Sequence, residues 1–144
     1  MIAIASDHGG YALKQALVEY LAARGVPAED LGCGGEPVDY PDYAEKLCKA
    51  VLAGQYERGI LVCGTGIGMS IAANKIPGIR AALCADCYSA EMARQHNDAN
   101  ALCLGGRTLG SELAKKIVDT YLDTPFSHGP HHCQRIAKIK ELEK

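Results

Sequence analysis

A cysteine followed by a glycine-rich loop is the strongest candidate for chemistry in this sequence. Cys63 ends an apolar run and is followed by Gly64, Thr65, Gly66, Ile67 and Gly68. Glycines let backbone amides approach a ligand closely, and a helix that starts in such a loop favours negative charge at its N-terminus. The glycine spacing does not match a dinucleotide-binding fingerprint. The loop therefore predicts an anion site with a thiol beside it, or simply a tight turn between a strand and a helix.

The position of Cys63, at the carboxyl end of a strand and facing the start of a helix, favours the thiolate form of its side chain. A thiolate there acts as a nucleophile or as a base. Most strand cysteines are small apolar core residues, and this is our interpretation of Cys84 and Cys103. Taken alone, Cys63 leaves these alternatives open.

Two other segments carry side chains suited to proton transfer and phosphate binding. His96 and Asn97 lie in a polar loop, where a histidine near a crevice transfers protons close to neutral pH. His131 and Arg135 are four residues apart and share one face of the first turn of a predicted terminal helix, a place that suits a phosphate. His8, also beside a helix start, is a further candidate. The alternatives are a solvated surface histidine and a polar helix with incidental charge.

Cys84 and Cys87 form a CxxC pair, which raises the question of zinc or redox chemistry. The further ligand candidates are His128, His131, His132 and Cys133. Structural zinc sites usually have two tight ligand pairs in loops, and a redox CxxC usually opens the helix after the first strand. Cys84 instead ends an apolar run, so we expect neither use.

The elements that position these residues alternate between short apolar runs and amphipathic stretches, the pattern of parallel βαβ units. We expect strands at 2–6, ending at 30–31, and at 59–63, 79–84 and 101–104. We expect helices ending before Gly25, around 47–52, and at 69–74, 89–95, 111–121 and about 131–143. The prediction is one domain over 1–144, a three-layer α/β/α Rossmann-like fold with a five-stranded parallel sheet. Asp7, His8, Cys63, Asp86 and Arg107 follow strands and are expected to meet at one crevice.

Composition limits the classes of partner. The chain has 144 residues, is 48% apolar and has a net charge of −2. Acidic and basic residues alternate without a basic stripe, so we expect no nucleic acid partner. The apolar start is too short for a signal peptide or a membrane span. The seven cysteines are odd in number, which favours reduced thiols and a cytoplasmic protein.

Five segments together resemble the type B ribose-5-phosphate isomerases. They are SDHGGYALK at 6–14, DYPDYA at 39–44, CGTGIGMSIAANKIPGIRA at 63–81, RQHNDAN at 94–100 and GGRTLG at 105–110. The resemblance implies an aldose-ketose isomerase that interconverts ribose 5-phosphate and ribulose 5-phosphate and needs no metal or cofactor. It also implies a homodimer or a dimer of dimers, with active sites between subunits. Related galactose-6-phosphate and allose-6-phosphate isomerases share much of this pattern.

The same resemblance implies roles for individual residues. Cys63, with Thr65 beside it, is the base that forms a cis-enediolate, and His96 helps to open the furanose. Asn97 and the loop amides hold the enediolate oxygens. Those loop residues are Gly64, Gly66, Ile67, Gly68 and Ser70. The other implied substrate contacts are Asp7, His8, Tyr40, Arg135 and Arg107, the last reaching a neighbouring subunit's pocket.

One position departs from the family pattern. His131 stands where the ribose enzymes usually carry an arginine, in Gly-Pro-His-His rather than Gly-Gly-Arg-His. Histidine is shorter than arginine and partly neutral at pH 7. The substitution favours a roomier pocket, so a hexose 6-phosphate is an alternative substrate. A sugar-phosphate binder without catalysis is the rival from another class.

Overall fold

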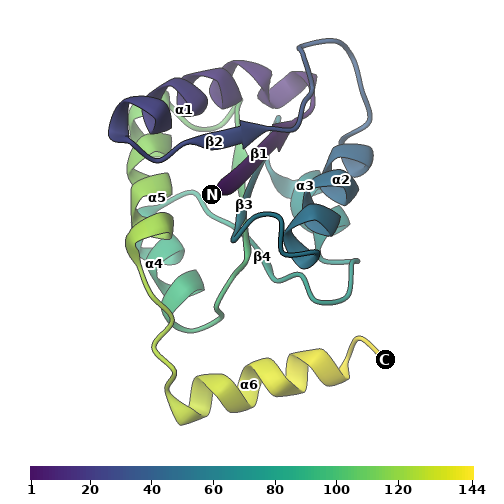
Figure 1. The fold of residues 1–144 in the computed structure, drawn as a ribbon, viewed down its shortest axis with the longest axis vertical. Coiled ribbons are helices and arrows are strands. Elements are labelled where there is room, and N and C mark those ends of the chain that lie inside the picture. Colours follow the sequence, from purple (N-terminus) through teal and green to yellow (C-terminus); the bar gives the residue numbers. More distant parts are fainter.

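The computed structural model describes residues 1–144 as one parallel sheet with helices on both faces (Figure 1). The strands are β1 (Ile2–Ser6), β2 (Ala28–Asp30), β3 (Gly59–Cys63), β4 (Ala81–Leu83) and β5 (Ala101–Gly105), in the spatial order β2-β1-β3-β5-β4. The helices are α1 (Tyr11–Arg24), α2 (Tyr40–Leu52), α3 (Ile67–Ala73), α4 (Cys87–Gln95), α5 (Ser111–Asp123) and α6 (Pro130–Glu141), with a 3-10 turn η1 (His8–Gly10) before α1. The predicted three-layer α/β/α fold with five parallel strands is confirmed.

Alternate strand residues fill two cores, one on each face of the sheet. Ile4, Ile60 and Leu102 pack with α1, α4 and α5. Their neighbours Ala5 and Leu61 pack with α2 and α3 on the other face. Successive side chains of a strand point to opposite faces, so a strand covered on both sides is apolar throughout. This is why β1, β3 and β5 are continuous apolar runs.

The carboxyl ends of β1 and β3 mark the place where the sheet can hold a ligand. From these adjacent strands the chain continues through α1 on one face and through α3 on the other. Open α/β sheets bind ligands at such a switch point. The turn after β1 approaches β3 so closely that a Cβ on Gly10 would lie 2.4 Å from the carbonyl oxygen of Val62. Glycine is required there.

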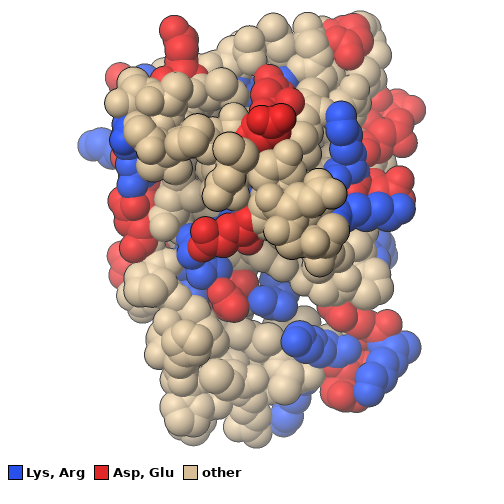
Figure 2. Space-filling model, in the orientation of Figure 1, with Lys and Arg blue, Asp and Glu red and all other residues tan.

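Helix α6 stands apart from the rest of the chain and has no buried residue (Figure 1). The backbone N–H of Gly78 donates a hydrogen bond of 2.9 Å to Glu143 just beyond the helix. A groove of about 600 Å³ separates α6 from the body, and Figure 2 shows the hollow with basic and acidic side chains around it. None of the helices has the length and apolar character needed to cross a bilayer.

The observed boundaries differ from the predicted ones by a few residues. β4 covers only Ala81–Leu83 because the two residues before it bond elsewhere. The N–H of Ile79 donates to Ile76 in a turn, and the N–H of Arg80 donates to the Asn100 side chain. α3 begins at Ile67 rather than 69, and α6 covers Pro130–Glu141 rather than 131–143.

Candidate active site

Cys63 lies at the carboxyl end of β3 with its sulfur directed into the glycine-rich loop. Its Sγ accepts a hydrogen bond of 3.1 Å from the N–H of Gly66, and the residue is only 4% exposed. None of the other six cysteines accepts such a bond, so the loop distinguishes Cys63 from them.

The loop keeps this geometry because two of its glycines have no room for a side chain. Gly66 has a φ of +79°, and a Cβ there would lie 2.6 Å from Leu83. A Cβ on Gly68 would lie 2.6 Å from the ring of Tyr40. Tyr40, at the start of α2, therefore covers the loop. Thr65 is exposed and its Oγ1 accepts the N–H of Ile67 at 3.2 Å.

Asp7 and His8 follow β1 and lie beside the end of β3. The N–H of Asp7 donates to the Val62 carbonyl at 3.2 Å, and its carboxylate accepts the N–H of Gly10 at 3.0 Å. The Nδ1 of the exposed His8 accepts the N–H of Val38 at 3.3 Å. That bond leaves Nε2 as the proton-bearing nitrogen of the neutral ring.

Arg107 follows β5 and reaches the same loop. Its N–H donates to the carbonyl of Gly64 at 2.9 Å, and its guanidinium would lie 3.3 Å from a Cβ on Gly64. The N–H of Gly106 donates to the Cys63 carbonyl at 2.8 Å. One edge of the sheet thus brings together the thiol, the loop and side chains of both charges. Arg107 lies against its own chain's loop, at the strand end where the crevice was expected.

His96 and Asn97 lie at the opposite edge of the sheet. They follow α4 and precede β5, and the carbonyl of Asn100 accepts the N–H of Gly59 at the start of β3. Strands rise about 3.3 Å per residue, so the length of β5 separates the two edges by roughly 15 Å. Within one chain, His96 and Cys63 therefore cannot act on the same small substrate.

Helix α6 lies at the same edge as His96. The rings of His96 and His132 stack, with centroids 4.2 Å apart and an angle of 10° between their planes. Burial and the nearby His96, Arg135 and His131 lower the pKa of His132 below its ordinary value of 6.5. His131 and Arg135 are exposed and one turn apart on α6. His8 and Arg135, both expected at the phosphate, thus lie at different edges of one chain.

The remaining expected clusters have structural explanations. The Asp86 carboxylate caps α4 by accepting the N–H and the hydroxyl of Ser89 at 2.7 and 2.8 Å, and these bonds lower its pKa. Burial raises the pKa of Cys84 to about 11, which makes it a poor redox thiol because a redox pair needs a thiolate. No three His, Cys, Asp or Glu side chains are grouped in a way that would hold a metal.

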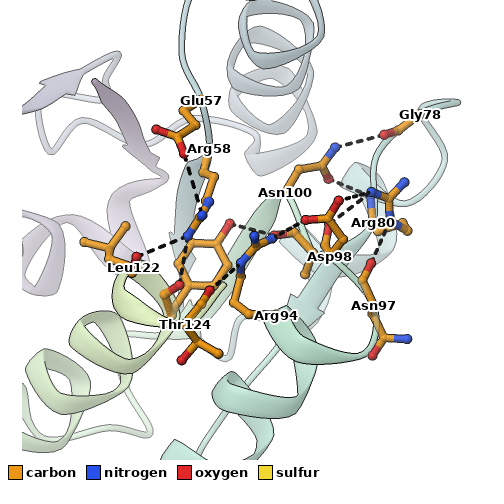
Figure 3. Close-up of polar contacts among 12 residues, drawn as sticks. Glu57, Arg58, Gly78, Arg80, Arg94, Asn97, Asp98, Asn100, Leu122 and Thr124 are labelled. Carbon is orange, nitrogen blue, oxygen red and sulfur yellow. Dashed lines mark hydrogen bonds and ion pairs between the residues drawn. The ribbon is translucent and has the colours of Figure 1, made fainter. Parts of the chain in front are cut away.

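Three residues that contact this second edge had not been singled out from the sequence. Arg80, Arg94 and Asp98 form a polar network around the loop that carries His96 and Asn97 (Figure 3). The one available signal was the spacing of four between Arg94 and Asp98, which suits an ion pair on a helix. Arg80 is too distant in the sequence for any such signal.

Comparison with known proteins covers nearly the whole chain. Residues 2–139 match the family described as Ribose/Galactose Isomerase. Ribose-5-phosphate isomerase B of Escherichia coli is 48% identical over 144 residues, covering 99% of this chain and 96% of that protein. A D-erythrulose-4-phosphate isomerase of Pectobacterium atrosepticum is 47% identical over 130 residues, covering 89% of this chain and 86% of its own.

Solved structures agree with this assignment. The structure of ribose-5-phosphate isomerase B from Clostridium thermocellum is 53% identical in sequence and superposes with a TM-score of 0.95. The match covers 99% of this chain and 96% of that one. The chain therefore belongs to the ribose/galactose isomerase family and is an aldose-ketose isomerase.

Proposed function

We propose that this enzyme interconverts ribose 5-phosphate and ribulose 5-phosphate through a cis-enediolate, with Cys63 as the base. The observation that carries the proposal is the Cys63 sulfur, which receives the Gly66 N–H at 3.1 Å. The thiolate removes the proton from C2 of the open-chain aldose, and the electron pair forms the C1–C2 double bond as the C1 carbonyl oxygen becomes an oxyanion. Return of the proton to C1 and transfer of the O2 proton to O1 give the ketose.

The other side chains at the Cys63 edge serve the same reaction. Thr65 follows in the same loop, and the backbone N–H groups of Gly64 and Gly68, which make no hydrogen bond within the chain, offer donors to the developing oxyanion. Loss of one such donor typically costs about 3 kcal/mol of barrier. Asp7 holds sugar hydroxyls, Tyr40 covers the loop, and the positive charge of Arg107 lies next to Gly64.

The residues at the opposite edge complete the site from a second copy of the chain. His96 opens the furanose, Asn97 adds a donor for the enediolate, and Arg135 and His131 hold the phosphate together with the first copy's His8. The roughly 15 Å between the two edges favours this arrangement over a site within one chain. We therefore propose a homodimer, or a dimer of dimers, in the cytoplasm.

Exposed apolar side chains also support a second copy. Ile67 and Ile71 on α3 are 51% and 59% exposed, and Tyr88 on α4 is 72% exposed. Leu142, just after α6, is 83% exposed. A chain that stays alone in water rarely leaves so many large apolar side chains uncovered.

A hexose 6-phosphate is the alternative substrate. His131 is the observation that favours it, because a shorter and partly neutral side chain leaves more room for the phosphate than an arginine would. The family's D-erythrulose-4-phosphate isomerase indicates that relatives of similar identity differ in their sugar.

The test is turnover of ribose 5-phosphate, allose 6-phosphate and galactose 6-phosphate by the wild type and by Cys63→Ala. We expect kcat/KM to be highest for ribose 5-phosphate, whereas a higher value for either hexose 6-phosphate would favour the alternative substrate. The Cys63→Ala change should nearly abolish turnover while substrate still binds. Cys133→Ala, which removes an exposed thiol on α6, is the matched control and should keep wild-type rates. Full activity in Cys63→Ala would exclude the thiol as the base, and binding without turnover in the wild type would favour the non-catalytic rival.

A further inference from the structure

The loop between α4 and β5 is held by two arginines that approach it from different elements (Figure 3). Arg94, in the last turn of α4, is 5% exposed and donates from Nη1 to the Asp98 carboxylate and to the Ala99 carbonyl, both at 2.8 Å. Arg80, just before β4, donates from Nε to the Asn97 carbonyl at 2.8 Å and from Nη2 to the Asp98 carbonyl at 3.0 Å. Three consecutive residues of the loop are therefore fixed by charged donors.

Asp98 is where the two arginines meet. Its carboxylate pairs with Arg94 at 2.8 Å and with Arg80 at 3.7 Å. Its φ is +46°, a conformation that a non-glycine residue keeps only when its surroundings hold it. The next turn is fixed too, because the Asn100 side chain accepts the Arg80 N–H at 2.8 Å and donates to the Gly78 carbonyl at 2.9 Å.

This network holds the backbone carbonyls of residues 97–99 and the Asp98 carboxylate, and it makes no hydrogen bond to the side chains of His96 and Asn97. The side-chain amide of Asn97 points away from the arginines in Figure 3, and no hydrogen bond is made by it. The His96 side chain contacts only the stacked His132 ring among aromatic partners. The network therefore fixes the backbone from which both side chains project, and a fixed backbone is what a site shared with a second copy requires.

Burying arginine is unfavourable unless its charge is paired and its donors are satisfied. Two arginines on one short turn exceed what closing a helix-to-strand connection needs. The equivalent connection from α1 to β2 closes with a left-handed glycine, Gly25 at φ +83°, and no arginine holds its backbone. The difference indicates that the exact position of the His96 loop matters for more than chain reversal.

We propose that Asp98, which forms ion pairs with Arg80 and Arg94, is a positioning residue that sets the placement of His96 and Asn97 in the active site of the second copy. The inference rests on the proposed function, because it assigns a role within that site. A misplacement of about 1 Å at a catalytic group can cost roughly a hundredfold in rate. We therefore expect loss of these contacts to lower kcat more than it changes KM.

The test is Asp98→Asn, which keeps the size of the side chain and its tolerance for a left-handed backbone but removes the charge that both arginines face. We expect kcat for the best sugar phosphate to fall by about tenfold or more while KM changes by less than about twofold. Hydrogen exchange of the amides at 97–100 should become faster in the same variant.

Asp119→Asn is the matched control. Asp119 accepts from Tyr20 Oη at 2.5 Å and from Arg24 at 2.6 Å, on the face formed by α1 and α5. The Asp119→Asn change also removes a charge that pairs with an arginine, but Asp119 bonds to none of the residues that hold the His96 loop, so kcat should stay at the wild-type value. If Asp98→Asn fails to fold, Arg80→Lys serves as a second variant. It keeps the charge but not the paired hydrogen bonds to the carbonyls of Asn97 and Asp98, and it should show a smaller fall in kcat with unchanged KM.

Two outcomes would overturn the inference: kcat unchanged in a folded Asp98→Asn, or KM and kcat altered alike in Asp98→Asn and Asp119→Asn. Failure of the proposed function looks different, because the wild type would then show no isomerase activity or Cys63→Ala would keep it. In that event the exchange rates at 97–100 alone decide whether Asp98 fixes the loop, and unchanged rates would contradict it.

Discussion

Among single residues, the cysteines show how position decides chemistry. Burial raises the pKa of Cys48 to about 12 and that of Cys84 to about 11. Burial also raises the pKa of Cys103, which lies within the sheet. These thiols stay protonated at neutral pH and serve as small apolar side chains. Cys63 is the one cysteine whose sulfur accepts a backbone N–H, that of Gly66 at 3.1 Å.

His131 is the residue through which we expect the substrate preference to be altered. His131→Arg places a permanent charge and a planar fork one turn from Arg135, on the same face of α6. We expect KM for ribose 5-phosphate to fall by about threefold to tenfold, the effect of one added charged contact to a phosphate. Steady-state kinetics with the same sugar panel measures this.

Cys133→Arg is the control for that change, because it adds the same charge on the opposite face of the same exposed turn. It should leave KM unaltered. A KM that stays constant or rises in His131→Arg would contradict a phosphate role for this position.

At the scale of helices and strands, much of the fold was predictable from the sequence. The apolar runs marked β1, β3 and β5 because both faces of these strands are buried, and glycines at 25 and 64–68 marked where elements end. β4 was predicted too long, because its flanking residues are paired by Asn100 and a turn rather than by the sheet. Such pairings depend on contacts between distant segments, which local pattern does not contain.

The candidate site was predictable only in part for the same reason. Asp7, Cys63 and Arg107 follow strands, so their meeting at the carboxyl edge could be inferred from the parallel topology. His96 follows a helix and precedes a strand, which places it at the edge where the strands begin. The predicted order of helices and strands was sufficient to infer this position. The grip of Arg80 on residues 97 and 98 was not predictable, since it joins segments 17 and 18 residues apart through side chains.

One contact between helix α6 and the body is the stack of the His96 and His132 rings, and this contact should respond to pH. The pKa of His132 is lowered in the folded chain, by burial first and then by His96, Arg135 and His131. The unfolded chain therefore binds the proton more readily. The stability contributed by the neutral ring is present above the ordinary pKa of 6.5 and is lost as the pH falls through the lower folded value.

We predict that the unfolding temperature of the wild type falls more steeply between pH 7 and pH 5 (roughly the range in which histidine titrates) than that of His132→Phe. Phenylalanine keeps a flat ring against His96 but cannot take up a proton. Thermal unfolding of both proteins across this range measures the difference. Parallel curves for the two proteins would show that His132 does not carry the pH dependence.

At the scale of the whole molecule, the separation of the two edges leads to a prediction that differs from the one for a site within a single chain. If Cys63 of one copy works with His96 of another, Cys63→Ala and His96→Gln each inactivate both sites of a dimer. A hybrid of the two variants has one site with both changes and one with neither. Random mixing makes half of the dimers hybrid, so about a quarter of the wild-type rate should return.

The control mixture combines Cys63→Ala with Asp7→Asn, two changes at the same edge of one chain, where the N–H of Asp7 bonds to Val62 beside Cys63. Here every site in a hybrid carries one of the two changes, so mixing should give no more than the average of the parents. Isomerase activity is measured after subunits are refolded together. If the Cys63→Ala and His96→Gln mixture stays as inactive as its parents while hybrids form, the two edges do not share a site, and His96 would need a role outside the reaction of Cys63.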